Sequence, residues 1–374
     1  MIRTIKSLTM LLLIALIPAL FLQISSINAL TPSFTYVTVN KYELFISPYN
    51  LTNISLLLQN ASESIYAELY ELTYQHIINI LAEKAEQGLQ VYVVLSAYTY
   101  DGIPYSEEEA VQYLENHGVH VKFLSNFYYV HSKVFVIDNR TTIISTNNPT
   151  YYGLTEDKGL AIAIYNKTIS TWFATIILND YKGYFPAYTY PGLVVSPINS
   201  YYQLYGLFSS PSSTIYAAFE EIYSDSGLTN ALLSHQKHII ITTRNDVGLP
   251  TTYDLTAKVA VVGNYTYIGS INLSNTSLFQ NRELGIIIKN DRLAVEIASI
   301  IENWSGYTTT NHTSLEHYQT STNYTTYPNS SSQISHFTKG LEQITESINK
   351  NTMIALVAVV LFIISFYVAV EKKK

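Results

Sequence analysis

The sequence predicts an α/β fold that is built twice, as two tandem lobes that each contain a mixed β-sheet flanked by helices. Three observations support this prediction. Short apolar runs alternate with helical patterns, a segment of the first half returns in the second half, and 48% of the 374 residues are hydrophobic. This hydrophobic content is sufficient for one large or two medium cores.

The internal repeat is visible in two short segments. Residues 45–50 (FISPYN) return as residues 194–199 (VVSPIN), and residues 64–67 (SIYA) return as residues 214–217 (TIYA). Because one supersecondary unit has been copied, each half is expected to bring the same kinds of side chain to the same place in its sheet.

The elements around the repeat follow the same order in both copies. In the first, a strand at 65–72 leads into a helix at 74–87, which Gly88 ends, and then into a strand at 89–95. The second copy has a strand at 215–223, a weaker helix and another strand. Strands that alternate with helices indicate one α/β lobe per copy.

A pair of short apolar strands split by a turn comes later in each copy. They cover residues 133–137 and 142–144 in the first copy, and residues 258–262 and 267–268 in the second. Two such lobes, placed side by side, predict a cleft at their junction, which is the usual place for a site.

Chemistry-bearing residues cluster at these hairpins. His131 and Lys133 are two apart on a strand and therefore point to one face, while Asp138 follows across the turn. Lys258 begins the second hairpin, and each copy continues into a segment that ends in asparagine. Lysine is a point charge for a phosphoryl oxygen, asparagine donates hydrogen bonds, and imidazole attacks or carries a proton near neutral pH, so this constellation predicts phosphate chemistry.

His-x-Lys followed by Asp and then by a Gly-Ser-x-Asn-like element, present twice in one chain, resembles the phospholipase D superfamily. In that family one histidine attacks phosphorus to form a phosphohistidine, and the histidine of the other copy protonates the leaving group. The resemblance implies His131 as the nucleophile, with Lys133 and Asp138 in the same motif. The residues that it implies for the phosphate are Lys133, Asn148, Lys258, Ser270 and Asn272, and the supporting carboxylates are Glu156 and Glu283.

The second motif departs from the family pattern. Thr256 stands in place of the second histidine, and Gly263 stands in place of the second aspartate. Threonine has no proton to exchange near pH 7, and loss of a general acid costs about 10²- to 10⁴-fold in rate. The degenerate motif therefore leaves three alternatives: a slow enzyme, an enzyme for substrates with good leaving groups, or a binding remnant.

The ends of the chain predict its location. Arg3 and Lys6 precede an apolar run and small residues, so residues 1–29 are expected to be a signal peptide. The lobes are assigned to residues 33–187 and 188–304, the second being degenerate. A Ser-, Thr- and Asn-rich stalk at 305–350, a transmembrane helix at 351–371 and a basic cytoplasmic tail at 372–374 follow. We therefore expect a single-pass cell-membrane protein whose globular part is extracytoplasmic and glycosylated.

Composition narrows the choice of substrate. The net charge of −7 gives no long-range attraction to a polyanion, so nucleic acid is a less favoured substrate than phospholipid. The chain has no cysteine and no evident metal-ligand cluster, and the resemblance implies no cofactor or metal. The sequence thus favours a membrane-anchored phosphodiesterase acting on phospholipid; a nuclease-type member of the same superfamily and a silent phosphate- or glycan-binding protein remain the alternatives.

Overall fold

The computed structural model of the chain describes residues 33–306, apart from residues 189 and 213. The predicted signal peptide, most of the predicted stalk, and the predicted transmembrane helix and tail lie outside these residues. Among the described residues, no helix is long and apolar enough to cross a membrane.

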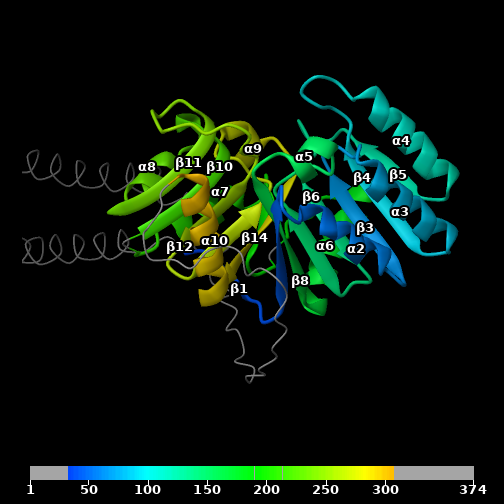
Figure 1. The fold of residues 1–374 in the computed structure, drawn as a ribbon, viewed down its shortest axis with the longest axis horizontal. Coiled ribbons are helices and arrows are strands. Elements are labelled where there is room, and N and C mark those ends of the chain that lie inside the picture. Colours follow the sequence, from blue (N-terminus) through cyan, green and yellow to red (C-terminus); the bar gives the residue numbers. More distant parts are fainter. Residues whose placement is uncertain (1–32, 189, 213, 307–374) are drawn as a thin grey trace, which may run out of the picture. The chain divides into compact units, whose positions relative to one another are not determined.

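The first lobe contains a seven-stranded mixed sheet with the order β2-β8-β7-β6-β3-β4-β5 (Figure 1). Its parallel part, β3-β4-β5, is linked by helices, and its antiparallel part contains the first predicted hairpin as β6 and β7. The strands are β2 (Tyr42–Ser47), β3 (Ser64–Leu69), β4 (Gln90–Ser96), β5 (His120–Leu124), β6 (Lys133–Ile137), β7 (Thr141–Ser145) and β8 (Gly159–Tyr165). The helices are η1 (Leu51–Asn53), α2 (Ile54–Gln59), α3 (Gln75–Glu86), α4 (Tyr105–Asn116), α5 (Tyr151–Thr155) and α6 (Lys167–Tyr181).

The second lobe repeats this plan with a sheet of order β1-β14-β13-β12-β10-β11, in which β9 also pairs with β14. The strands are β1 (Val37–Thr38), β9 (Leu193–Ser196), β10 (Thr214–Ile222), β11 (Lys237–Asn245), β12 (Lys258–Val262), β13 (Tyr265–Gly269) and β14 (Glu283–Lys289). The helices are α7 (Ser200–Phe208), η2 (Ser224–Ser226), α8 (Thr229–Leu233), α9 (Asn275–Phe279) and α10 (Asp291–Trp304). The short strand β1 pairs with β14, so the first described strand belongs to the sheet of the second lobe.

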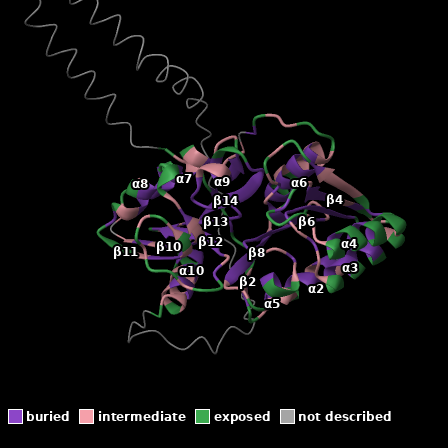
Figure 2. Cartoon of the chain, turned by 90° about the horizontal axis from the view of Figure 1, so that it is seen from above, coloured by how far each residue is buried: buried purple, intermediate pink, exposed green. Residues whose placement is uncertain are grey.

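Three hydrophobic clusters hold the lobes together. One outer cluster packs α2, α3 and α4 on the first sheet, and another packs α7 and α8 on the second. The third lies between the sheets and includes residues of both, together with α6 and α10. Buried strands and partly exposed outer helices are visible in Figure 2. Because the central cluster is shared, each hairpin is held against the other lobe, which is the feature that positions the site.

Candidate active site between the two lobes

The two histidine-type motifs meet through matched backbone contacts between the lobes. The amide of His131 donates to the carbonyl of Arg282 at 2.7 Å, and the amide of Thr256 donates to the carbonyl of Lys158 at 2.9 Å. Each contact continues an isolated parallel bridge, at 130–282 and at 158–255. Thr256 therefore occupies in the second copy the position that His131 occupies in the first.

His131 forms a pair with a carboxylate from the other lobe. Its Nδ1 lies 3.1 Å from Oε2 of Glu283, a residue that is fully buried at the start of β14. Ser277 and Asn281 donate to the other oxygen of Glu283 and so fix its orientation. Burial, and next the charge of Lys133, lower the pKa of His131. At neutral pH the imidazole is therefore uncharged, with the Nδ1 proton toward Glu283 and the Nε2 lone pair free.

Lys133 lies directly beside this pair. Its Nζ donates to the carbonyl of His131 at 2.6 Å and sits 5.4 Å from the ring centre of Tyr70. Burial, and next the charge of Lys258, lower the pKa of Lys133 to about 7. The two lysines are thus close enough to repel each other, which favours an anion between them.

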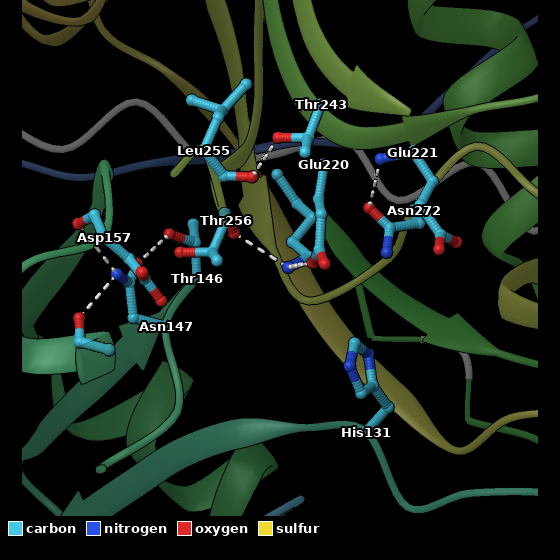
Figure 3. Close-up of polar contacts among 12 residues, drawn as sticks. His131, Thr146, Asn147, Asp157, Glu220, Glu221, Thr243, Leu255, Thr256 and Asn272 are labelled. Carbon is cyan, nitrogen blue, oxygen red and sulfur yellow. Dashed lines mark hydrogen bonds and ion pairs between the residues drawn. The ribbon is translucent and has the colours of Figure 1, made fainter. Parts of the chain in front are cut away.

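Lys258 forms an ion pair with a carboxylate, whereas Lys133 forms none among the described residues. Its Nζ lies 2.7 Å from Oε2 of Glu220 and donates to the carbonyl of Thr256 at 2.8 Å. Burial would raise the pKa of Glu220, but Lys258 outweighs it, and the pKa falls to about 2. Figure 3 shows Glu220, Thr256 and Asn272 on the second lobe, facing His131 on the first. The second lysine is therefore already neutralised by an internal acid.

Glu220 was not among the residues predicted from the sequence, although an alignment of the two repeats could have identified it. Phe219 pairs with Lys258 as Leu69 pairs with Lys133, so Glu220 is the equivalent of Tyr70. A tyrosine ring in one copy and a carboxylate in the other make the two halves of the site electrostatically unequal.

The structure does not bring Asp138 into the site. It follows β6, at the opposite end of the strand from Lys133, and its carboxylate accepts from the amides of Ser62, Glu63 and Ser64. Asp138 has a positive φ of 53°. Gly263, at the same place in the second copy, has a φ of 60°. The family aspartate here closes a turn, and its replacement by Gly263 leaves the chemistry of the second motif untouched.

Two of the predicted phosphate residues have internal partners. Ser270 is fully buried, and its Oγ accepts from the amide of Leu284 at 3.2 Å. Asn272 Oδ1 accepts from the amide of Glu221 at 3.2 Å, beside the Glu220–Lys258 pair. Asn148 is half-buried, and its Oδ1 has no hydrogen-bond partner among the described residues. Ser270 thus holds β14 in place, whereas Asn272 borders the site.

Glu156 is not the counterpart of Glu283. Its amide donates to the carbonyl of Tyr152 as that of Gln280 donates to Thr276, so Glu156 corresponds to Gln280 and is exposed. The strand register instead aligns Glu283 with Gly159.

No carboxylate fits at Gly159. A Cβ added there would lie 1.6 Å from Oδ1 of Asn147, whose amide also donates to the carbonyl of Gly153. Position 147 corresponds to Ile271 in the second copy. The second motif has therefore lost both the histidine and the carboxylate that would pair with it.

Residues 54–181 match the family model described as cardiolipin synthase, PLD-like domain. This match covers the first lobe from α2 to the end of α6 and includes the whole first motif. No curated protein sequence matches the chain.

Solved structures resemble this fold at low sequence identity. Phosphatidylserine synthase from Haemophilus influenzae aligns over 72% of this chain and 88% of its own, with a TM-score of 0.54 and 14% identity. Polyphosphate kinase from Porphyromonas gingivalis aligns over 70% of this chain and 50% of its own, with a TM-score of 0.57 and 15% identity. Nuc from Salmonella typhimurium, a phospholipase D family member, aligns over 38% of this chain and 94% of its own, with a TM-score of 0.36 and 23% identity.

Proposed function

This chain belongs to the phospholipase D superfamily, and from that premise we propose that it is a phosphodiesterase whose nucleophile is His131. The observation that carries the proposal is the pair formed by His131 Nδ1 and Glu283 Oε2 at 3.1 Å, with Lys133 adjoining. A carboxylate that holds one ring nitrogen in its protonated form directs the lone pair of the other nitrogen toward substrate.

The proposed reaction has two steps. Nε2 of His131 attacks phosphorus, the bond to the leaving oxygen breaks, and the leaving alkoxide takes a proton from water. Water then attacks the phosphohistidine, which releases a phosphomonoester and restores the imidazole. Lys133 stabilises the phosphoryl oxygens, and Glu283 stabilises the positive charge on the ring while the N–P bond exists.

Neither of the two described residues of the second lobe that face His131 at this position, Thr256 and Glu220, is an acid for the leaving group. Thr256 cannot donate a proton near pH 7, and Glu220, with a pKa of about 2, is ionised there. The enzyme is therefore expected to hydrolyse diesters with good leaving groups quickly, and diesters of simple alcohols, phospholipids among them, slowly.

Phospholipid is the substrate class we favour. The predicted signal peptide and the uncharged run at 353–370 support an extracytoplasmic enzyme tethered to the membrane, close to lipid phosphodiesters. The net charge of −7 and the pairing of Lys258 with Glu220 at the site disfavour a polyanion such as nucleic acid.

Hydrolysis of an activated aryl phosphodiester by the full-length protein tests the proposal. We expect His131→Ala to abolish turnover, and the matched variant Thr256→Ala in the other lobe to retain it. Equal rates for wild type and His131→Ala would contradict the proposal. Parallel assays with phosphatidylcholine vesicles and with a dinucleotide then separate a lipase from a nuclease.

A catalytically silent phosphate- or glycan-binding protein is the second candidate. The ion pair between Glu220 and Lys258 favours it, because the pair neutralises one of the two lysines that a transferred phosphoryl group needs. Binding of a diester without turnover, at the same site, would select this alternative.

A further inference from the structure

A cluster of charged side chains is buried beneath the His131 motif. The guanidinium of Arg282 contacts both carboxylate oxygens of Asp180, at 2.6 and 2.9 Å, and donates to the carbonyl of Ser196 at 3.4 Å. Glu68, on β3, adjoins Asp180 and accepts from the hydroxyl of Ser132 at 2.6 Å. Glu68, Ser132, Asp180 and Arg282 all have no exposed surface. Two acids and one base at zero exposure are costly and call for an explanation.

The cluster is joined to the motif at consecutive residues. Ser132, between His131 and Lys133, bonds to Glu68, and the carbonyl of Arg282 accepts the amide of His131 at 2.7 Å. Arg282 is also the residue directly before Glu283. The main chain of Arg282 thus fixes both the backbone of His131 and the start of β14, the strand that carries Glu283.

A proton bound to one of the two acids explains how this cluster can be buried. Two carboxylates face one guanidinium, so the cluster is neutral only if one acid is protonated. Glu68 Oε2 is buried and has no partner among the described residues if both acids are ionised. A proton on Glu68 lets it donate to Asp180, whose carboxylate accepts from the guanidinium of Arg282. Burial, and next the charge of Asp180, raise the pKa of Glu68 well above its ordinary value.

The duplication provides an internal control. Strand registers align Glu68 with Ala218, Ser132 with Ala257 and Arg282 with Lys158, and the helices align Asp180 with Trp304. Lys158 points instead to the carbonyl of Tyr253. The half of the site around His131 has the whole cluster, with Glu68, Ser132 and Asp180 from the first copy and Arg282 from the second, whereas the half around Thr256 has none of it. A cluster needed only to hold two lobes together would have no reason to follow the histidine.

We propose that Glu68, Asp180 and Arg282 are positioning residues that hold His131 against Glu283 through a shared buried proton. The inference rests on the proposed role of His131 as nucleophile. None of the three residues touches substrate; they act through Ser132 and through the main chain of Arg282.

The test is the exchange rate of the His131 Nδ1 proton with solvent, measured by NMR on the full-length protein with labelled histidine. Glu68→Gln retains an N–H donor toward Asp180 and an acceptor for Ser132, so it should exchange like the wild type. Glu68→Ala and Ser132→Ala install the residues that the second copy carries and are therefore expected to fold. In both, exchange should rise roughly two- to tenfold, which corresponds to the loss of one hydrogen bond.

Ile80→Ala is the control for general destabilisation, because Ile80 is buried in the outer cluster of the first lobe. It should lower the unfolding midpoint without changing the exchange rate. Wild-type exchange in Glu68→Ala and Ser132→Ala, or exchange in Glu68→Gln as fast as in Glu68→Ala, would overturn the inference. A wild-type protein without a protected Nδ1 proton would refute the histidine–carboxylate pair itself, and with it the proposed function, so the two failures are distinguishable.

Discussion

Replacing Glu220 by glutamine should strengthen anion binding at the site. In the wild type, Glu220 Oε2 lies 2.7 Å from Lys258 Nζ, and the lysine side chain is 2% exposed. An anion that approaches this lysine meets a carboxylate that is already in place. The amide of Glu220→Gln preserves the shape of the side chain and the contact, and removes only its negative charge.

The size of the effect follows from the geometry. A unit negative charge about 5 Å from a bound anion costs about 3 kcal/mol at an effective dielectric constant of about 20. Arg244, 2.8 Å from Glu220 and 55% exposed, offsets part of this repulsion, and solvent screens more of it. About half of the repulsion should remain, which corresponds to roughly a tenfold gain in affinity.

Calorimetric titration of inorganic phosphate into both proteins measures this gain. Glu221→Gln is the matched control, since Glu221 contacts Arg244 at 2.8 Å and makes no ion pair with Lys258. Affinity of the wild type should fall as the pH rises through about 7, because Lys133, with its pKa of about 7, then loses its charge. Phosphate binding by Glu220→Gln that is no tighter than binding by the wild type and Glu221→Gln would contradict this prediction.

Three further changes follow from the site and its surroundings. Thr256→His alone should leave diesterase activity within about twofold of the wild-type activity. The triple variant with Gly159→Glu and Asn147→Ile should raise the activity by up to about 10²-fold, because it restores a histidine acid paired with a carboxylate; kcat of each variant measures the effect. Asp138→Ala should lower the unfolding free energy by about 1–2 kcal/mol at neutral pH, because it removes hydrogen bonds to a charged group. Burial would raise the pKa of Asp138, but the hydrogen bonds from residues 62–64 outweigh it and lower the pKa, so this difference should shrink below pH 3.8 in urea titrations. Since the pKa of Glu68 is raised, wild type should lose stability relative to Glu68→Gln as the pH rises above 4.5 toward the folded-state pKa.

Much of the fold and the first half of the site follow from local pattern. Apolar runs, glycine stops and the returned segments at 45–50 and 194–199 are properties of neighbouring residues, and they predict two α/β lobes. His131 and Lys133 share one face because strand periodicity dictates it. Glu283 was also predicted, as a supporting carboxylate that the family resemblance implies.

The remaining features depend on register between distant strands. The equivalence of Glu156 and Gln280 becomes visible only when the hydrogen bonds of α5 and α9 are compared. Glu220 lies far from Lys258 in sequence and meets it only because β10 and β12 pair. Asp138 was misplaced because spacing alone does not reveal which end of β6 faces the other lobe. Long-range strand pairing decided the case of Glu220, whereas Glu156 and Asp138 depended on how each motif is placed in the folded copy.

The central claim is that His131 becomes covalently bonded to phosphorus during turnover. Full-length protein would be incubated with a phosphodiester labelled on phosphorus, quenched in alkali, where phosphohistidine survives and phosphoesters of serine and threonine are depleted, and digested for mass spectrometry. We predict label on the peptide that contains His131 in the wild type and in Thr256→Ala, and none in His131→Ala. Label on another residue, or measurable turnover with no label on His131 at any quench time, would contradict the account.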